Sequence, residues 1–134
     1  MPKKPRVLVA DDDPQLCDLL SAFLRERGWD VDVARDGMQA VMFTTRHLPD
    51  VVLLDVNMPG GTGVDALQRI RRSTKTALVP VVVMSGNTDA HMPFTMRSHG
   101  ATEYVAKPLD LDALHALLTR IVSATASRGR KKQR

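Results

Sequence analysis

The sequence predicts an α/β fold, in which a five-stranded parallel sheet is covered by helices on both faces in a doubly wound (βα)5 arrangement. Short apolar, β-branched runs alternate with segments of helical spacing five times along the chain. Three of these runs, Val7–Val9, Val51–Leu54 and Val81–Met84, are apolar throughout, as strands buried on both faces must be. The 134 residues, 43% of them hydrophobic and 25% charged, match the size and composition of one ordinary folded domain.

The expected strands are all short and rich in β-branched residues. The second one alternates apolar and acidic residues from Trp29 to Val33, which favours a place at the edge of the sheet. The five expected strands are Arg6–Ala10, Asp30–Ala34, Val51–Asp55, Pro80–Met84 and Glu103–Ala106.

The segments between the strands carry apolar side chains at spacings of three and four residues, which is typical of helices that pack on a sheet. The first stripe is Leu16, Leu19, Leu20, Phe23 and Leu24; the second is Met38, Val41, Met42 and Thr45; the third is Val64, Leu67 and Ile70; the last is Leu111, Leu114, Leu117, Leu118 and Ile121. We also expect Trp29, Met38, Met42 and Met84 to fill the core.

Helix boundaries can be read from caps and breakers. Asp13, followed by Pro14, and Asp110 are expected N-caps, and Gly28 and Gly100 are natural helix stops. Pro93 lies inside the fourth helical segment, and proline is tolerated only in the first turn of a helix. We therefore expect a short fourth helix that starts near residues 92–93, after a mobile loop over residues 86–91.

The positive charge of the chain is concentrated at its two ends. The formal net charge is +4, yet the part of the chain between these ends is net acidic. The basic residues at the ends are Lys3, Lys4, Arg6, Arg128, Arg130, Lys131, Lys132 and Arg134. We divide the chain into a basic N-terminal extension (1–5), one domain (6–123) and a basic tail (124–134), expected to be disordered after a frayed helix end. With no nucleic-acid-binding module in the sequence, binding to nucleic acid is expected only non-specifically, through the tail.

Three features indicate the compartment. The longest apolar run, 78–84, is far shorter than the ~20 residues that cross a membrane. Acidic residues interrupt the basic start before a signal-peptide core can form. Cys17, the single cysteine, cannot form an internal disulfide and suits a reducing compartment. The sequence therefore predicts a cytoplasmic protein that does not contact a membrane.

Polar side chains follow four of the expected strands at the points where the strands end. Parallel α/β sheets bind ligands at this edge. Carboxylates that converge repel one another unless a cation lies among them, and hard oxygen ligands favour Mg²⁺. A carboxylate can also attack phosphorus to form an aspartyl-phosphate, while lysine and hydroxyl groups bind the phosphoryl oxygens. The side chains are Asp11, Asp12 and Asp13 after the first strand, Asp55 at the third, Ser85 at the fourth and Lys107 after the fifth.

Four motifs in this order carry a resemblance to a known family. They are Val-Ala-Asp11-Asp12-Asp13, Leu-Leu-Asp55-Val-Asn-Met-Pro59, Val-Met-Ser85-Gly86 and Tyr104-Val-Ala-Lys107-Pro108. Over roughly residues 5–122 the chain resembles the receiver domain of two-component response regulators, of the chemotaxis-receiver type. The resemblance implies the flavodoxin-like strand order 2-1-3-4-5 and a cis peptide between Lys107 and Pro108.

The resemblance also implies a role for each site residue. Asp55 would accept a phosphoryl group from the phosphohistidine of a sensor histidine kinase or phosphotransfer protein, or from a small phosphodonor. Mg²⁺ would be bound by Asp11, Asp12, Asp55 and the backbone carbonyl of Asn57.

Further roles concern the bound phosphoryl group and the response to it. Ser85 and Lys107 would bind the phosphoryl oxygens, and Ser85 and Tyr104 would change position on phosphorylation. Asn57 and Asn87 would flank the water that hydrolyses the phosphoryl group and so tune dephosphorylation. The face formed by the fourth helix, fifth strand and fifth helix would be the one through which the domain engages a downstream protein partner or dimerises.

Simpler interpretations stand beside these roles. Asp13 is explained as a helix cap alone, and Tyr104 is equally well explained as a core aromatic side chain. The Asn57 and Asn87 amides are also of the kind that satisfies loop backbone groups.

Two other functions fit parts of the pattern. A Mg²⁺-dependent phosphatase with an aspartate nucleophile is disfavoured, because such hydrolases carry a second aspartate where this chain has Asn57, and because the chain has no room for a cap domain. A constitutive interaction domain without phosphorylation, a pseudo-receiver, is disfavoured by the intact acidic set. We expect a signalling switch without an output domain in this chain that turns over no external metabolite, and so not an enzyme in the ordinary sense.

Overall fold

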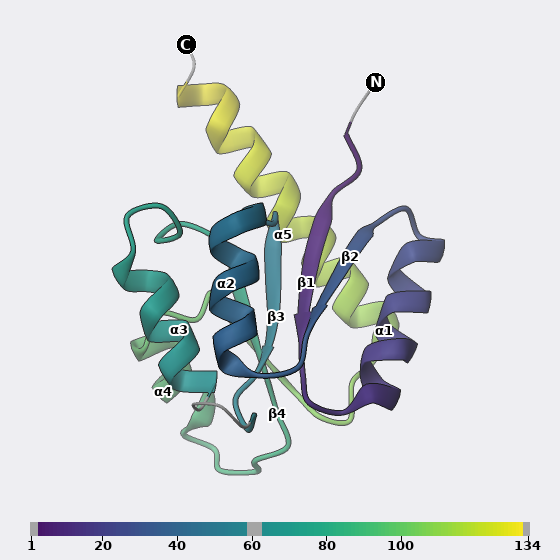
Figure 1. Cartoon of the computed structure of the whole chain (residues 1–134), viewed down its shortest axis with the longest axis vertical. Coiled ribbons are helices and arrows are strands. Elements are labelled where there is room, and N and C mark those ends of the chain that lie inside the picture. Colours follow the sequence, from purple (N-terminus) through teal and green to yellow (C-terminus); the bar gives the residue numbers. More distant parts are fainter. Residues whose placement is uncertain (1–2, 59–62, 133–134) are drawn as a thin grey trace.

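The computed structural model describes residues 3–58 and 63–132, with side chains described as far as residue 126 in the last helix. Its centre is a sheet of five parallel strands in the order β2-β1-β3-β4-β5 (Figure 1). The strands are β1 (Arg6–Ala10), β2 (Asp30–Ala34), β3 (Val51–Asp55), β4 (Val81–Ser85) and β5 (Glu103–Ala106). The predicted fold class, the 2-1-3-4-5 order and the edge position of the second strand are confirmed, and only the fourth strand is shifted, by one residue.

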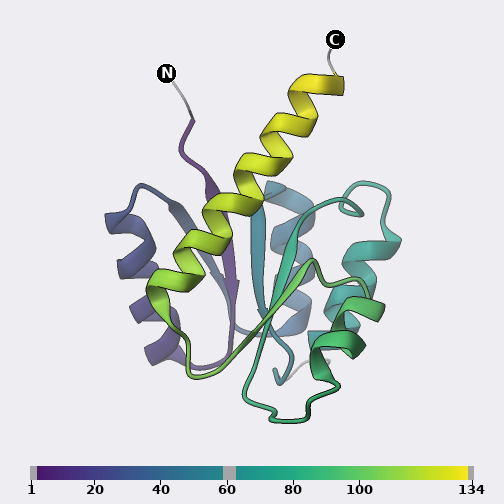
Figure 2. The ribbon, with the colours of Figure 1, turned by 180° about the vertical axis from the view of Figure 1, so that it is seen from behind.

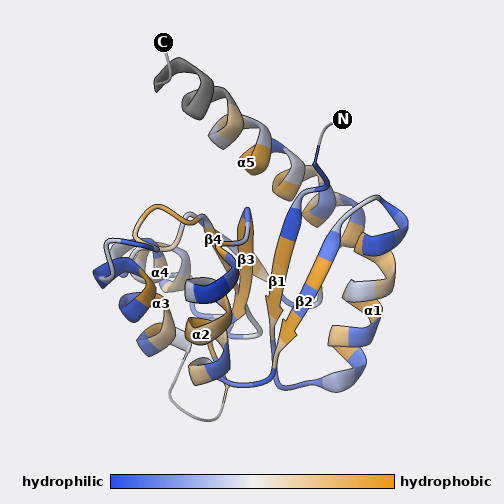
Figure 3. Cartoon of the chain, turned by 45° about the horizontal axis from the view of Figure 1, so that its top comes forward, coloured by the Kyte–Doolittle hydropathy of each residue, from blue (hydrophilic) through white to orange (hydrophobic). Residues whose placement is uncertain are grey.

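Five helices cover the two faces of the sheet. Helices α1 and α5 lie on one face and α2, α3 and α4 on the other (Figures 1 and 2). Successive residues of β1 point to opposite faces of the sheet. Val7 and Val9 pack in the core beneath α1 and α5, whereas Leu8 and Ala10 pack in the core beneath α2, α3 and α4. In Figure 3 the inner strands are mainly hydrophobic, and β2 alternates. The helices are α1 (Pro14–Glu26), α2 (Gly37–His47), α3 (Gly63–Arg72), α4 (Met92–Ser98) and α5 (Leu111–Lys132).

The predicted caps and stops are confirmed. The Asp13 carboxylate accepts hydrogen bonds from the backbone N–H groups of Gln15 and Leu16, and the Asp110 carboxylate accepts one from Ala113. Gly28 and Gly100 both have positive φ angles, 89° and 109°, and each follows the C-cap residue of its helix, α1 or α4. Helix α4 has 7 residues and carries its proline in the first turn, as the position of Pro93 predicts.

The buried faces of α1 and α2 differ from the predicted ones. Leu19 in α1 is exposed. Met38 and Met42 in α2 are also exposed, by 63% and 44%, so the expectation that they fill the core is wrong. The fully buried residues of α2 are small, the partly buried Val41 and Phe43 pack against the same core, and the two methionines lie on the exposed side of the helix. The buried residues are Cys17, Leu20, Ser21 and Leu24 in α1, and Gly37, Ala40 and Thr44 in α2.

Arg71, near the end of α3, ties three segments together. Its guanidinium donates to the backbone carbonyls of Gly100 at 2.8 Å, Val79 at 2.6 Å and Ala77 at 3.2 Å. Burial lowers the pKa of Arg71. The three carbonyls belong to the α3–β4 and α4–β5 connections, so one side chain holds both connections at the amino-terminal edge of the sheet.

The C-terminal helix is longer than predicted. A disordered tail was expected from residue 124, but the helical backbone of α5 continues to Lys132. The physical reason is that extending an existing helix needs no new nucleus, and no proline interrupts these residues. The domain boundaries at residues 5 and 123 stay predictions. Across the described part of the chain, none of the helices has the length and apolar character required to cross a membrane.

Candidate functional site

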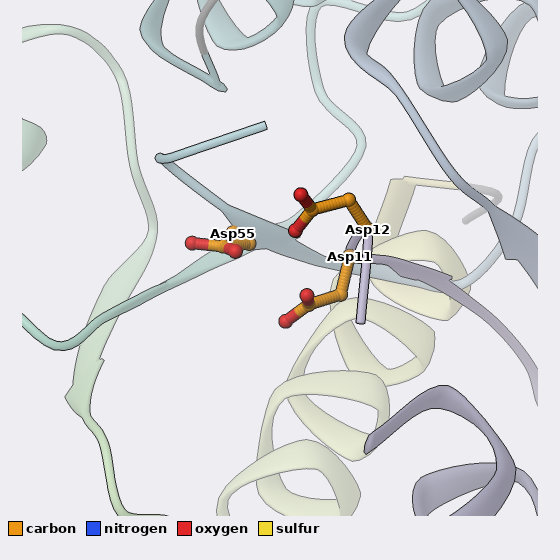
Figure 4. Close-up of side chains that lie close together, drawn as sticks. All are labelled: Asp11, Asp12 and Asp55. Atoms are coloured by element: carbon orange, nitrogen blue, oxygen red, sulfur yellow. The ribbon is translucent and has the colours of Figure 1, made fainter. Parts of the chain in front are cut away.

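Three carboxylates meet at the carboxyl-terminal edge of the sheet. Strands β1 and β3 are neighbours, with Ala10 paired to Leu54, so the residues that follow, Asp11 and Asp55, come side by side. Figure 4 shows the side chains of Asp11, Asp12 and Asp55 turned toward a common space. One carboxylate oxygen of each lies within 4.8 Å of the others. The fold therefore brings together the acidic residues that the sequence places after separate strands.

Asp11 is the most firmly held of the three. It is 1% exposed, and its Oδ1 accepts a hydrogen bond from the Asp13 backbone N–H at 2.9 Å. Its Oδ2 accepts one from Lys107 Nζ at 2.8 Å. On the core side, the Cys17 thiol donates to the Asp11 backbone carbonyl at 3.2 Å. Sequence reasoning took Cys17 only as an indicator of compartment; the signal for this contact was its place one helical turn after the Asp13 cap.

Asp55 is buried at the end of β3 with both of its oxygens engaged. Oδ1 accepts a hydrogen bond from the Asn57 backbone N–H at 3.0 Å, and Oδ2 lies 3.4 Å from Lys107 Nζ. Burial raises the pKa of Asp55, and the nearby Asp11 charge acts in the same direction. The Asn57 N–H and the Lys107 ammonium oppose this rise without cancelling it. The Asp55 carboxylate is thus largely removed from water, which is the main cause of its raised pKa.

Lys107 connects the two buried carboxylates. Burial would lower its pKa, but its hydrogen bond to Asp11 and the negative charges of Asp11 and Asp55 raise the pKa overall. Its backbone N–H donates to the Ser85 carbonyl at 2.8 Å, which holds the lysine beside the end of β4. The peptide bond between Lys107 and Pro108 is cis, as the resemblance implied.

The donor set fits Mg²⁺. All three candidate ligands are carboxylates, which are the hard oxygen donors that Mg²⁺ prefers. Among the described residues, one cation, Lys107, pairs with two of them. Asp12 is exposed while Asp11 and Asp55 are buried, so the cluster is open on one side. An open side leaves room for the water ligands that Mg²⁺ usually keeps.

The β4–α4 loop, residues 86–91, connects the site to Tyr104. The Ser85 hydroxyl is fully buried and accepts a hydrogen bond from the Asn87 backbone N–H at 3.0 Å. The Asn87 side-chain oxygen accepts one from the Asp89 backbone N–H at 2.8 Å, so this amide does satisfy a loop group. Tyr104 is half-buried against the α2/α3/α4 core, and its hydroxyl donates to the Asn87 carbonyl at 3.3 Å. Ser85, Asn87 and Tyr104 thus form one hydrogen-bonded chain.

Gly63, at the start of α3, lies directly against the end of β3, next to Asp55. Its N–H donates to the Val56 carbonyl at 3.0 Å. A Cβ atom on Gly63 would overlap the backbone of Asp55 and Val56, so only glycine allows α3 to approach the end of β3 this closely. Nothing in the sequence around Gly63 links this glycine to Asp55, because the contact forms only when α3 folds back against the end of β3. Asn57 is exposed, and Pro59 lies outside the described residues.

The family model of the response regulator receiver domain matches residues 7–119. The DNA-binding dual master transcriptional regulator RpaA of Synechocystis sp. is 32% identical over 121 residues, which cover 90% of this chain and 50% of that protein. The chain spans about half the length of the curated relatives it matches.

Solved structures agree in fold. The receiver domain of the Francisella response regulator 1452 has a TM-score of 0.85 and 28% identity, covering 90% of this chain and 98% of that chain. The receiver domain of the sensor histidine kinase PA1611 from Pseudomonas aeruginosa PAO1 carries a magnesium ion in its active site cleft. It has a TM-score of 0.83 and 27% identity, with 90% of this chain and 99% of that chain covered.

Proposed function

Since the chain belongs to the family of response regulator receiver domains, we propose that it is a phosphorylation-controlled switch whose phosphoacceptor is Asp55. The observation that carries this proposal is the arrangement around that side chain. Asp55 is a buried carboxylate of raised pKa, flanked by two further carboxylates and by one lysine. No other described group of three metal-binding side chains is this close together.

The proposed reaction transfers a phosphoryl group from a phosphohistidine of a sensor histidine kinase or phosphotransfer protein. One Asp55 oxygen forms a bond to phosphorus while the phosphorus–nitrogen bond breaks. The electron pair of that bond stays on the imidazole nitrogen, which takes up a proton. The Lys107 ammonium lies 3.4 Å from Asp55 Oδ2 and would bind a phosphoryl oxygen, as would the Ser85 hydroxyl after a small movement.

Asp11, Asp12, Asp55 and the Asn57 backbone carbonyl are the proposed ligands of Mg²⁺. When bound, the cation supplies positive charge that offsets the negative charge on the phosphoryl oxygens. Asp11 is held by Asp13 and Lys107 before any ligand arrives, so little side-chain ordering is left for binding.

Phosphorylation would be sensed through the hydrogen-bonded chain from Ser85 to Tyr104. The Ser85 hydroxyl now accepts from the Asn87 N–H, so a phosphoryl group that attracts this hydroxyl would pull on the β4–α4 loop. Tyr104 donates to the same loop at the Asn87 carbonyl and would follow. We expect a shift between existing conformations, read by a downstream protein at the α4–β5–α5 face.

Dephosphorylation would be tuned by Asn57 and Asn87. Neither side chain bears a charge or the bulk needed to exclude an attacking water from the phosphorus. Asn87 uses its side-chain oxygen on the Asp89 N–H, which leaves its NH₂ group as the donor available to a water. We expect the phosphorylated form to last seconds to minutes.

The test uses a small phosphodonor with Mg²⁺ and intact-mass analysis. The wild-type chain should gain one phosphoryl group, and Asp55→Asn should gain none while circular dichroism shows an unchanged fold. Asp12→Ala should lose Mg²⁺ binding and phosphorylation together. Stable phosphorylation of the Asp55→Asn variant would overturn the assignment of the acceptor. Continuous release of phosphate without an accumulating phosphoprotein would favour a phosphatase instead.

A further inference from the structure

One peptide unit joins two of the three clustered carboxylates, those of Asp11 and Asp12. Asp11 is buried, with one carboxylate oxygen bonded to the Asp13 N–H and the other to Lys107. Asp12 is exposed, and within the described part of the chain its carboxylate has neither a hydrogen bond nor an ion pair. Figure 4 shows both side chains leaving this backbone on the side of Asp55. The direction of the Asp12 carboxylate therefore depends on the backbone that carries it.

The Cys17 thiol holds this peptide unit from the core side. Its Sγ lies 3.2 Å from the Asp11 backbone carbonyl oxygen, to which the thiol donates a hydrogen bond. No other described residue donates to that oxygen. Cys17 is itself held, because its N–H donates to the Asp13 carbonyl at 3.1 Å in the first turn of α1. The thiol thus links the start of α1 to the peptide unit between the two carboxylates.

Burial keeps water from taking the place of the thiol. Cys17 and Asp11 are each 1% exposed. A buried carbonyl that loses its donor carries the cost of its lost hydration, and rotation of the peptide plane relieves that cost. Such a rotation changes ψ of Asp11 and φ of Asp12 together. It therefore changes the direction in which the Asp12 carboxylate leaves the backbone, while Lys107 still holds the Asp11 carboxylate.

Packing in the core is the other role open to Cys17. The side chain belongs to the same buried cluster as Leu20 and Leu24, and a buried cysteine often serves as a small apolar residue. Packing alone would not require a donor at the Asp11 carbonyl. Ser21, one turn further along α1, is 6% exposed and forms no side-chain hydrogen bond with a described residue. It is therefore a matched residue on the same buried face, without the bond to Asp11.

We propose that Cys17 is a positioning residue for Mg²⁺ binding, which acts by holding the Asp11–Asp12 peptide unit through its thiol hydrogen bond. The inference rests on the proposed Mg²⁺ site of Asp11, Asp12 and Asp55. Mg²⁺ demands near-ideal octahedral geometry, so a small change in the direction of one carboxylate lowers its affinity. Groups that hold metal ligands in place typically change affinity about 10- to 100-fold. Because a thiol is a weak donor and acts here through the backbone, we expect a change of about threefold to tenfold.

The test is calorimetric titration of Mg²⁺ into the full chain and its Cys17 variants, each verified as folded by urea unfolding. Cys17→Ala removes the donor and should bind Mg²⁺ about threefold to tenfold more weakly than the wild type. Cys17→Ser keeps a donor at this position and should bind within about twofold of the wild type. Because serine is more polar than alanine, a role in packing alone would make Cys17→Ser no better than Cys17→Ala.

Two controls separate the hydrogen bond from the volume of the side chain. Ser21→Ala removes a small side chain from the same buried face and should leave the Mg²⁺ affinity unchanged. Cys17→Thr and Cys17→Val have nearly the same shape, and the threonine variant, which keeps a donor, should bind Mg²⁺ more tightly than the valine variant.

Three results would overturn the proposal: equal Mg²⁺ affinities of the wild type and Cys17→Ala, equal affinities of Cys17→Thr and Cys17→Val, or a Cys17→Ser variant as weak as Cys17→Ala. A wild-type chain that does not bind Mg²⁺ would overturn the proposed metal site, and this inference with it. Weaker binding by the variants without a donor, beside a wild-type chain that binds, supports both.

Discussion

Arg71→Ala should lower the free energy of unfolding by about 3 kcal/mol. The guanidinium makes three hydrogen bonds to backbone carbonyls at 3.2 Å or less, and each is worth ~1 kcal/mol net. A fourth contact, to the Thr102 hydroxyl at 3.4 Å, adds little. Because Arg71 is only partly buried, water can reach some of the released carbonyls, which keeps the loss from being larger.

Urea unfolding followed by circular dichroism measures this loss directly. The melting temperature should fall by about 10 °C, taking ~3 to 5 °C per kcal/mol for a domain of this size. The matched control is Arg72→Ala, which removes the same residue type from the next, exposed position of α3 and should change stability by less than about 0.5 kcal/mol.

A conservative variant separates geometry from charge. Arg71→Lys keeps the positive charge but replaces the planar fork with a single donor point, so it should recover about one of the three bonds, roughly 1 kcal/mol. If Arg71→Ala costs no more than Arg72→Ala, the guanidinium does not hold the two connections. If Arg71→Lys is as stable as the wild type, the positive charge and not the planar shape of the guanidinium would account for the contribution of Arg71 to the free energy of unfolding.

Four further outcomes are expected. Lys107→Met should bind Mg²⁺ at least about fivefold more tightly by calorimetry, since a unit charge removed from ~4 Å is worth about 1 kcal/mol even in water; weaker binding would contradict this. Gly63→Ala should lose about 1 to 3 kcal/mol in urea because its Cβ meets backbone, whereas Gly86→Ala, with open space around it, should lose under about 0.5; equal losses would refute the close approach. A raised pKa means that folded Asp55 binds its proton more tightly than unfolded Asp55, so its ionised form costs stability above that pKa. Asp55→Asn should therefore stabilise the Mg²⁺-free chain at neutral pH, with a gain that shrinks on acidification, and a gain that grows instead would reverse the sign. Asn87→Tyr should slow the decay of the phosphorylated form after donor removal, with ~1.4 kcal/mol for each tenfold change, and an unchanged decay would place Asn87 away from the attacking water.

Sequence reasoning was reliable where neighbouring residues decide the outcome. Continuous apolar runs correspond to the inner strands, and the Asp13 cap and the first-turn position of Pro93 gave correct helix starts. It was less reliable for helix faces. Met38 and Met42 fit a helical stripe, but the smaller Ala40 and Thr44 face the sheet. Several rotations of a short helix present an apolar stripe, and only packing against the sheet selects one.

The sequence by itself determined the fold class and the acidic residues that end β1 and β3, because strand burial and chain order follow from local composition. Only the tertiary structure decided which distant groups touch. The bonds of Lys107 to Asp11 and Asp55, and those of Arg71 to the carbonyls before β4 and β5, join residues far apart in sequence. The same holds for the start of β1 and the end of α5, which share one edge of the sheet because every strand runs in the same direction and every helix returns.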